Sequence, residues 1–367
     1  MQDLGGGRMN VDKSWFEKNR RHYLDSGSFR HFSELSGVDL ADLATDDPER
    51  KREAQQRLAA QSIILNEIRK EHAGFGFPLF VYTHFRELFE PVPRLNLEID
   101  KTILQRDMTD SLRRRHIALS HAILPDVFSD ASRRLGTRLT VHNLGSGAGL
   151  DVLHALRHRN DCVASVLNVD LNESALNLGR CLCASLAETG DIPPETVQFE
   201  FQNLTAPVGA CDVAVLIGVI CGLPDRTALA LLRRVWKSLR PGGALVISCA
   251  NVHMRSVDPL ASFLIQNIGT RGCPHRGWVL NYRTSFDLMR LLRAAGFARI
   301  ELYDDANFPG RDGLPPETLK SVDTLPASVY STKAHRRPLA LPSSPILERR
   351  LGYNWLAVAR KSAASTR

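Results

Sequence analysis

The stretch VHNLGSGAGLD, from Val141 to Asp151, decides which fold the sequence indicates. It contains three glycines, Gly145, Gly147 and Gly149, between an apolar run and a segment with a helical pattern. A glycine-rich turn after a strand lets backbone N–H groups approach a ligand, and the N-terminus of the following helix favours an anionic group. The stretch therefore predicts a strand, a ligand-binding turn and a helix, but it does not identify the ligand.

From residue 136 onward, apolar runs alternate with helical segments. The pattern predicts strands at 138–144, 163–170, 196–202, 212–220, 244–250, 298–304 and 353–361. It predicts helices at 150–157, 173–190, 226–239 and 286–297. Several of these strands are apolar throughout, which is typical of a parallel sheet with helices on both faces. We therefore expect an α/β protein whose glycine turn lies at the carboxyl end of the first strand, where open sheets bind ligands.

The first 135 residues lack this alternation and predict helices instead. Helix formers or aromatic residues near helical spacing fill three segments, 49–72, 77–90 and 107–124. We expect 1–135 to form a helical N-terminal cap or substrate region over a domain made of 136–304 and 351–362. Residues 305–350 are rich in proline and long for an ordinary loop, which indicates an insertion or a lid.

Composition and charge narrow the class of protein. The 367 residues are 43% hydrophobic, as expected for a globular protein with a proper core. No apolar stretch approaches the roughly 18–20 residues that span a bilayer, and the N-terminus lacks the apolar core of a signal peptide, so we expect a cytoplasmic protein. The seven cysteines are scattered without a C-x-x-C pair, which predicts reduced thiols and no metal site. The charge of +7 comes from dispersed residues and short clusters such as Arg113 to Arg115, which does not favour nucleic-acid binding but leaves it open.

Asp170 closes the second predicted strand, where a carboxylate can accept hydrogen bonds from both hydroxyls of a ribose. The dinucleotide pattern G-x-G-x-x-G is not met, because Leu150 replaces its last small residue. With the Pro-Gly-Gly turn inside Leu239 to Ser248, these features resemble the class I S-adenosylmethionine-dependent methyltransferases. The resemblance implies a Rossmann-like α/β fold of seven mostly parallel strands, the last one antiparallel, and S-adenosyl-L-methionine as cofactor.

Other segments extend the resemblance over roughly half of the chain, from about 136 to 303 plus the last strand. Val219 to Asp225 ends in Leu-Pro-Asp, as the family's segment after the fourth strand often does, and 285–304 is similar to its late helix and sixth strand. Pro274 to Thr284 resembles one group of bacterial methyltransferases of unsettled substrate. The matching positions imply cofactor contacts from Asn143, Gly145, Ser146, Gly147, Gly149, Asp170, Leu171, Asn203, Leu204, Ile217 and Gly218.

Two of these positions depart from the family, and several allow a purely structural role. Asn143 and Asn203 stand where the family commonly has acidic residues, which predicts a weaker hold on the ammonium group of the cofactor's methionine. Asp170 could cap the next helix, and Asn203 could simply form a turn. Ile217 and Gly218 could serve core packing alone.

Methyl transfer from a sulfonium requires alignment and a dry site, and a base only when the acceptor must lose a proton. The candidates for that base are His253, His275 and Tyr282, with further options in the cap at Tyr82, His84 and Arg86. Cys221 is expected to be a core residue. We expect methylation of an oxygen, a nitrogen or a carboxylate in a small-molecule acceptor. The alternatives are an RNA or protein methyltransferase, or a non-catalytic protein that binds S-adenosylmethionine.

Overall fold

A seven-stranded sheet forms the centre of the computed structural model, which describes residues 27–69, 81–82, 97–204, 209–268, 280–305 and 353–362. The strand order is β3-β2-β1-β4-β5-β7-β6. The strands are β1 (Leu139–Leu144), β2 (Val163–Asp170), β3 (Val197–Phe201), β4 (Cys211–Leu216), β5 (Leu239–Ala250), β6 (Arg299–Asp304) and β7 (Asn354–Arg360). Strands β1 to β5 pair in parallel, whereas β7 runs antiparallel between β5 and β6. The predicted Rossmann-like sheet is confirmed, and its strand order reverses between β1 and β4, next to the glycines that directly follow β1.

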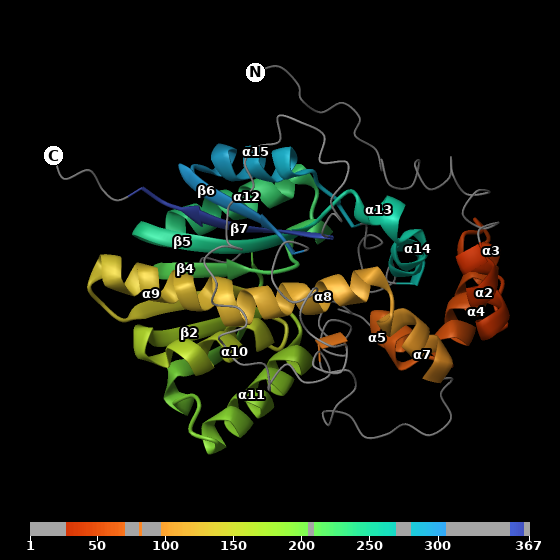
Figure 1. Ribbon diagram of the computed structural model, residues 1–367, viewed down its shortest axis with the longest axis horizontal. Helices are drawn as coiled ribbons and strands as arrows, with labels where there is room; N and C mark the ends of the chain where they lie inside the picture. The colour runs from red at the N-terminus through yellow and green to blue at the C-terminus, as the bar shows by residue number, and fades with distance from the viewer. Residues whose placement is uncertain are drawn as a thin grey trace, which may run out of the picture.

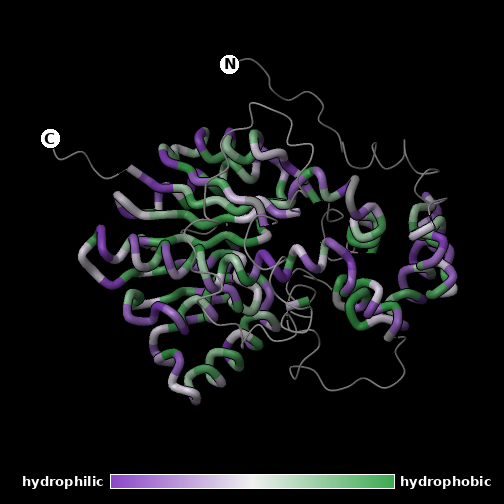
Figure 2. The backbone as a smooth tube through the Cα atoms, in the orientation of Figure 1, coloured by the Kyte–Doolittle hydropathy of each residue, from purple (hydrophilic) through white to green (hydrophobic). Residues whose placement is uncertain are grey.

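Helices cover both faces of this sheet (Figure 1). One face carries α9 (Leu124–Leu135), α10 (Leu150–Arg159) and α11 (Glu173–Glu188). The other carries α12 (Asp225–Ser238) and α15 (Ser285–Ala295). All residues of β4 are buried, and Figure 2 shows the strands as the apolar centre of the molecule. A parallel strand covered on both faces must be apolar throughout, which is why continuous apolar runs predicted these strands.

A long helical rod crosses from one end of the sheet to the other (Figure 1). It consists of α8 (Asp107–Ala118), a π-helical turn (Leu119–Ile123) and α9, and it ends at Gly136, which has a φ of 67°. The prediction that this helix ends at residue 124 was wrong. A helix is expected to end before Pro125, because proline has no N–H and its ring clashes with the carbonyl four residues earlier. The wider π-helical turn accommodates the proline, so the helix continues.

The predicted helix at 49–72 is two helices, α4 (Pro48–Ala59) and α5 (Ile63–Arg69). Buried Asp100 accepts hydrogen bonds from the Ser62 hydroxyl (2.5 Å) and from the N–H groups of Ile63 and Ile64 (both 3.2 Å), which starts a new helix at this point. The capping residue lies far away in the sequence, so helix propensity alone could not predict the break.

The remaining described helices lie at the carboxyl end of the parallel strands, on the right in Figure 1. They are α2 (Gly27–Ser36), α3 (Leu40–Leu43), α7 (Leu97–Leu104), α13 (Met254–Val257) and α14 (Pro259–Ile268). Short 3-10 turns occupy Asn160–Cys162, Pro194–Thr196 and Ile220–Gly222. In the described ranges, no helix combines the length and apolar character that crossing a membrane requires. The division at residue 135 stays a prediction, and almost all of the proposed insertion at 305–350 lies outside the described residues.

Candidate functional site

The glycine loop, residues 145–149, carries the chain from β1 into α10. Gly145, Gly147 and Gly149 have φ values of 64°, 55° and 77°, in the left-handed region that other residues rarely adopt. A Cβ atom added at Gly145 would lie 2.5 Å from Cγ2 of Val219, and one at Gly149 would lie 2.8 Å from Oδ1 of Asn168. Glycine is therefore required here both by the backbone conformation and by the space available.

Asp170, at the end of β2, holds this loop in place. Its Oδ2 accepts a hydrogen bond from the N–H of Gly147 (2.7 Å), and its Oδ1 accepts one from the N–H of Asn172 (2.9 Å). A carboxylate can accept about four hydrogen bonds, so each oxygen retains acceptor capacity. The cap of α11 is Asn172, whose side chain accepts from the N–H of Ala175 (3.1 Å), so the structural alternative for Asp170 as a helix cap is wrong.

The surroundings of this carboxylate fit a nucleoside. Leu171 follows directly and exposes 42% of its surface, so it offers an apolar seat for a flat base next to the ribose acceptor. Gly149 is the N-cap of α10, and no side chain caps that helix. Its first N–H groups can therefore attract a ligand's anionic group. The hydroxyl of Ser146 lies in the same loop, 3.1 Å from the carbonyl oxygen of Gly147.

Three other predicted cofactor positions, Asn143, Asn203 and Leu204, lie around the loop. Asn143 is 4% exposed, and its Nδ2 donates to Oδ1 of Asn168 (2.8 Å), its register partner on β2. Its amide is therefore committed to the sheet beneath the loop. Leu204 reaches the loop from β3, because its Cδ1 lies 3.5 Å from the Cβ position of Gly145. Asn203 is exposed beside it.

The end of β4 supplies the next part of the site. The predicted strand at 212–220 ends earlier, at Leu216, so Ile217 and Gly218 lie in the turn that follows. Gly218 has a φ of 72°, which a continued strand does not allow. Its N–H donates to the Ser248 hydroxyl on β5 (2.9 Å).

A polar layer on α8, missed by the sequence analysis, meets the glycine loop. We call Tyr82, Arg115, His116, Asp151 and His154 the α8 layer. Asp151 lies in the first turn of α10, and its Oδ1 is 2.6 Å from Nδ1 of His116. Nε2 of His116 is 3.1 Å from Nδ1 of His154. The Tyr82 ring stacks on His116 at a centroid distance of 4.3 Å, and its hydroxyl accepts from Nη2 of Arg115 (2.6 Å).

Burial sets the protonation of two members of this layer. It raises the pKa of the Tyr82 phenol, which stays neutral, and it lowers the pKa of His154 well below its usual value. The sequence signals for the layer were weak: Tyr82 was a cap candidate for the base, and the cluster Arg113 to Arg115 was considered only for its charge. Of the three cap candidates, Tyr82 is described, whereas His84 and Arg86 lie outside the described residues.

Two of the three predicted catalytic residues, His253 and Tyr282, lie on the side of α13 and α14. His253 is exposed and directly precedes α13, and its N–H donates to Oδ1 of Asn251 (3.2 Å). Tyr282 is half-buried, with its hydroxyl 3.4 Å from the Ser262 hydroxyl and its ring 4.6 Å from the Arg255 guanidinium. His275 lies outside the described residues. Their catalytic roles stay predictions.

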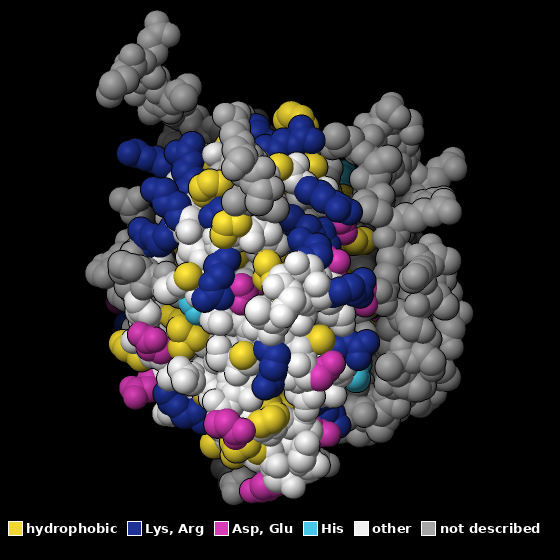
Figure 3. Space-filling view, turned by 90° about the vertical axis from the view of Figure 1, so that its left-hand side faces the viewer, with side chains coloured by type: hydrophobic (Ala, Val, Ile, Leu, Met, Phe, Trp, Pro, Cys, Tyr) yellow, Lys and Arg dark blue, Asp and Glu magenta, His cyan; other side chains and the backbone are white. Residues whose placement is uncertain are grey.

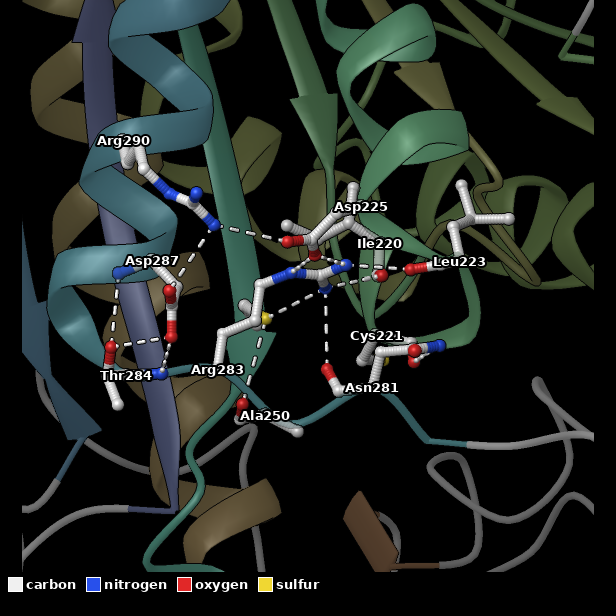
Figure 4. A network of polar contacts seen from close by, with 11 residues as sticks. Ile220, Cys221, Leu223, Asp225, Ala250, Asn281, Arg283, Thr284, Asp287 and Arg290 are labelled. Carbon is white, nitrogen blue, oxygen red and sulfur yellow. Dashed lines mark hydrogen bonds and ion pairs between the residues drawn. The ribbon is translucent and has the colours of Figure 1, made fainter. Parts of the chain in front are cut away.

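Arg283, also missed by the sequence analysis, holds the turn after β4 (Figure 4). The buried guanidinium donates to the carbonyl oxygens of Ile220 and Leu223 (both 2.7 Å) and pairs with Asp225 (3.0 Å). These contacts fix the segment that ends in Leu-Pro-Asp. Cys221, in the same segment, is buried as predicted, and its thiol donates to the carbonyl oxygen of Gly218 (2.8 Å). The role of Arg283 could not be predicted from the sequence, because two of its partners are backbone carbonyl oxygens, which every residue type has.

The strand order, the glycine loop and the acidic end of β2 together define the architecture of a class I S-adenosylmethionine-dependent methyltransferase. Residues 113–302 match a family model described as a methyltransferase domain. Because this match covers just over half of the chain, the protein belongs to that family, and its cofactor is S-adenosylmethionine.

Individual relatives are distant. A carboxy-S-adenosyl-L-methionine synthase from Glaesserella parasuis is 29% identical over 118 residues, which is 32% of this chain and 47% of that protein. The chain thus matches about half the length of this relative. A solved structure of a possible exported protein from Bordetella parapertussis shares 18% identity at a TM-score of 0.50, covering 92% of this chain and 100% of that one. It shows a shared fold.

A second solved structure is a magnesium protoporphyrin IX methyltransferase from Synechocystis, with bound S-adenosylhomocysteine. It shares 14% identity at a TM-score of 0.42, covering 82% of this chain and 100% of that one.

Proposed function

We propose that this protein transfers a methyl group from S-adenosylmethionine to an oxygen, a nitrogen or a carboxylate of a small molecule. The observation that carries the proposal is the carboxylate of Asp170, which is anchored on the glycine loop at 2.7 Å and keeps acceptor capacity at the end of β2, one strand away from the switch point of the sheet. A ribose placed there would direct the rest of the cofactor along the loop toward Gly218.

In this arrangement the backbone contributes as much as the side chains. Asp170 accepts the ribose hydroxyls, and Gly145, Ser146, Gly147 and Gly149 shape the loop that receives the methionine part of the cofactor. The adenine rests on Leu171, next to two predicted residues after β3, Asn203 and Leu204. Asn143 acts indirectly, by holding the strand beneath the loop. Ile217 and Gly218 close the site at the end of β4.

Methyl transfer is an in-line displacement in which the positive charge of the sulfonium disappears, so alignment and exclusion of water matter most. The α8 layer supports this role. Arg115 and His116 are buried, and the bond between His116 and Asp151 ties α8 to the helix that follows the glycine loop. An acceptor that must lose a proton would also need a base, for which Tyr282, His253 and His275 remain our candidates.

The distribution of charge supports a small acceptor over a polyanion. Figure 3 shows the face at the amino ends of the parallel strands, where Lys and Arg side chains are interspersed with Asp and Glu. At this end of the sheet Arg240 pairs with Asp212 (2.8 Å), and Arg134 pairs with Asp130 (3.2 Å). This basic face lies opposite the glycine loop and is partly neutralised, so it does not lead a nucleic acid into the site.

The test is turnover with a library of phenols, amines and carboxylic acids, followed by mass spectrometry of acceptor and cofactor. We expect a methylated acceptor and stoichiometric S-adenosylhomocysteine from the wild type. We expect at least about a hundredfold lower rate from Asp170→Ala, because charge-assisted hydrogen bonds to the ribose are lost. Asp191→Ala removes a carboxylate that pairs with Arg157 (3.0 Å) away from the loop, and it should retain activity.

Other products would contradict the proposal in distinct ways. Methylation of RNA or protein, but of no small molecule, would show that the protein acts on the alternative substrates. A carboxylated cofactor in place of a methylated acceptor would contradict methyl transfer itself. Cofactor binding with no transfer to any acceptor would indicate a non-catalytic protein.

A further inference from the structure

Backbone hydrogen bonds hold Tyr282 on both sides at the edge of the sheet where the site lies. The N–H of Asn281, the residue before it, donates to the carbonyl oxygen of Cys221 (2.5 Å) in the turn after β4. The N–H of Arg283, the residue after it, donates to the carbonyl oxygen of Ala250 (3.0 Å), the last residue of β5. Because β1, β4 and β5 are parallel, Tyr282 lies at the same edge as the glycine loop.

The helices α13 and α14, which lie at this edge in Figure 1, place two side chains around the phenol. The guanidinium of Arg255, on α13, lies over the Tyr282 ring at 4.6 Å from its centroid. The hydroxyl of Ser262, on α14, lies 3.4 Å from the phenol oxygen. Arg255 and Ser262 are 6% and 3% exposed, whereas Tyr282 is half-buried. The phenol thus has a buried cation over its ring and a neutral hydroxyl beside its oxygen.

The charge of Arg255 favours the ionised form of this phenol. Burial lowers the pKa of Arg255, and the Coulombic attraction of an ionised Tyr282 opposes that effect. The attraction is mutual, since an opposite charge within about 4–6 Å lowers the pKa of an acid by about 1–3. The guanidinium therefore makes Tyr282 easier to deprotonate than a phenol in the same place without it.

The other titratable groups around the phenol oppose this effect only weakly. On the described segments that hold it, 251–262 and 280–284, they are His253, Asp258 and Arg283. His253 is exposed, and the carboxylate of Asp258 is neutralised by Arg106 (2.5 Å). The guanidinium of Arg283 pairs with a carboxylate on α12 (3.0 Å). The two thiols beside these segments, in the turn after β4 and on β5, stay neutral because burial raises their pKa.

We propose that Tyr282 takes the proton of an acidic hydroxyl on the methyl acceptor and that Arg255 is the positioning residue that favours the phenolate, an inference that rests on the proposed function. As the acceptor oxygen attacks the methyl carbon, its O–H bond breaks and the proton moves to the phenolate oxygen. The bond between sulfur and methyl breaks in the same step, and its electron pair stays on the sulfur. A phenolic acceptor fits best, because its pKa is close to the ordinary value of tyrosine, about 10, and the proton transfer is nearly balanced.

Absorbance titration of tyrosinate tests the role of Arg255 without any turnover. The difference between a protein and its Tyr282→Phe variant isolates this phenol among the six tyrosines. We expect the midpoint of its ionisation to rise by at least about one pH unit in Arg255→Met. Arg255→Lys, which keeps the charge, should retain part of the lower midpoint. Arg180→Met removes another arginine that lies over an aromatic ring, 5.8 Å from that of Phe199, and should leave the midpoint unchanged.

Turnover tests the proton transfer itself. Tyr282→Phe should lower kcat with phenolic acceptors by about a hundredfold or more, with little change in KM. Carboxylic acids have already lost their proton at neutral pH, so the same variant should methylate any that the wild type accepts at the wild-type rate. In Arg255→Met the decrease of kcat toward acidic pH should begin at a higher pH than in the wild type.

Three results would overturn the inference. They are a midpoint of Tyr282 that does not depend on Arg255, a Tyr282→Phe variant that methylates phenols as fast as the wild type, and a wild type that methylates carboxylic acids but no hydroxyl. A wild type that methylates no small molecule would instead contradict the proposed function. The absorbance titration would still report whether Arg255 favours the phenolate.

Discussion

The glycine loop and the α8 layer meet at the same edge of the sheet, but they are built in different ways. The loop is one continuous stretch whose backbone conformation is fixed by glycines at φ values of 64°, 55° and 77°. The α8 layer is assembled from side chains of three separate segments, held by contacts such as the 2.6 Å approach of His116 to Asp151. The glycine loop, where we propose that the cofactor binds, is therefore encoded locally, whereas the α8 layer depends on the tertiary structure.

This difference matters for function. A local backbone motif can stay specific for a single ligand, which we propose is the cofactor. Side chains from distant segments can differ according to the acceptor. Variants of either kind of region, the local backbone segment or the cluster of side chains from distant segments, should differ in effect, and the largest expected effect comes first.

The largest effect is expected from Arg283→Met, which removes a side chain that holds a segment distant from it in the sequence. The change leaves the carbonyl oxygens of Ile220 and Leu223, each bonded at 2.7 Å, without their donor. We expect the free energy of unfolding to fall by about 3 kcal/mol, because a buried ionic hub loses one member. Urea denaturation measures the change.

Arg290→Met is the matched control for this variant. Arg290 pairs with the same carboxylate, that of Asp225, at 3.3 Å, but its side chain is 50% exposed. Its loss should cost less than about 1 kcal/mol. Equal effects of the two variants would contradict the role assigned to Arg283.

Gly145→Ala disrupts construction by the local backbone. The new Cβ would lie 2.5 Å from Val219. The left-handed backbone adds about 1–2 kcal/mol for any residue with a Cβ. We expect a loss of stability above that range, measured by urea denaturation, together with a loss of S-adenosylmethionine binding in calorimetry.

Gly190→Ala is the control that separates the cost of the left-handed backbone from the cost of a crowded Cβ atom. Gly190 has a φ of 76°, yet a Cβ there would meet nothing within 4 Å. This variant should show only the backbone cost of about 1–2 kcal/mol and normal cofactor binding. If Gly145→Ala behaves identically, the loop is less constrained than we infer.

The smallest effect, when it is expressed per pH unit and per histidine, concerns the buried histidines. Burial lowers the pKa of His154 well below its usual value, and it lowers that of His121 to about 3. The unfolded chain therefore binds protons near pH 6.5 that the folded protein does not bind. Stability is full above that pH and falls as the pH decreases, by up to about 1.4 kcal/mol per pH unit for each histidine.

His154→Gln should reduce this slope by about one proton. Thermal or urea unfolding between pH 7.5 and 5 measures it in both proteins. A variant with the same slope as the wild type would contradict the neutral state of His154 in the folded protein.

The contrast between the two regions also explains how far the sequence could be interpreted. The strand at 163–170 was predicted to the residue, because a strand buried in a parallel sheet is apolar and the chain has to turn at Asp170. The break between α4 and α5 was not predicted, because its cause, Asp100, is remote from both helices. The length of β4 was overestimated, because Ile217 is apolar although it lies outside the strand.

The candidate site divides in the same way. The left-handed glycine loop and the place of Asp170 at the end of β2 could be predicted from spacing, since each depends on its own backbone or its place at a strand end. Their contacts with the cofactor stay a proposal. The hydrogen bond of Asn143 to Asn168 (2.8 Å) could not be predicted, because it depends on the pairing register of β1 and β2. Arg115 was considered only as part of the basic cluster Arg113 to Arg115, because burial of a helix face by residues 81–82 and β7 cannot be derived from local sequence.

The central claim is that Asp170 holds the ribose of S-adenosylmethionine against the glycine loop. The most direct test is calorimetric titration of S-adenosylhomocysteine and its 2′,3′-dideoxy analogue into the wild type and Asp170→Asn. We predict that loss of the ribose hydroxyls weakens binding to the wild type by about tenfold to a hundredfold, whereas the variant binds both compounds equally weakly. An equal loss in both proteins, or no loss in the wild type, would contradict the claim.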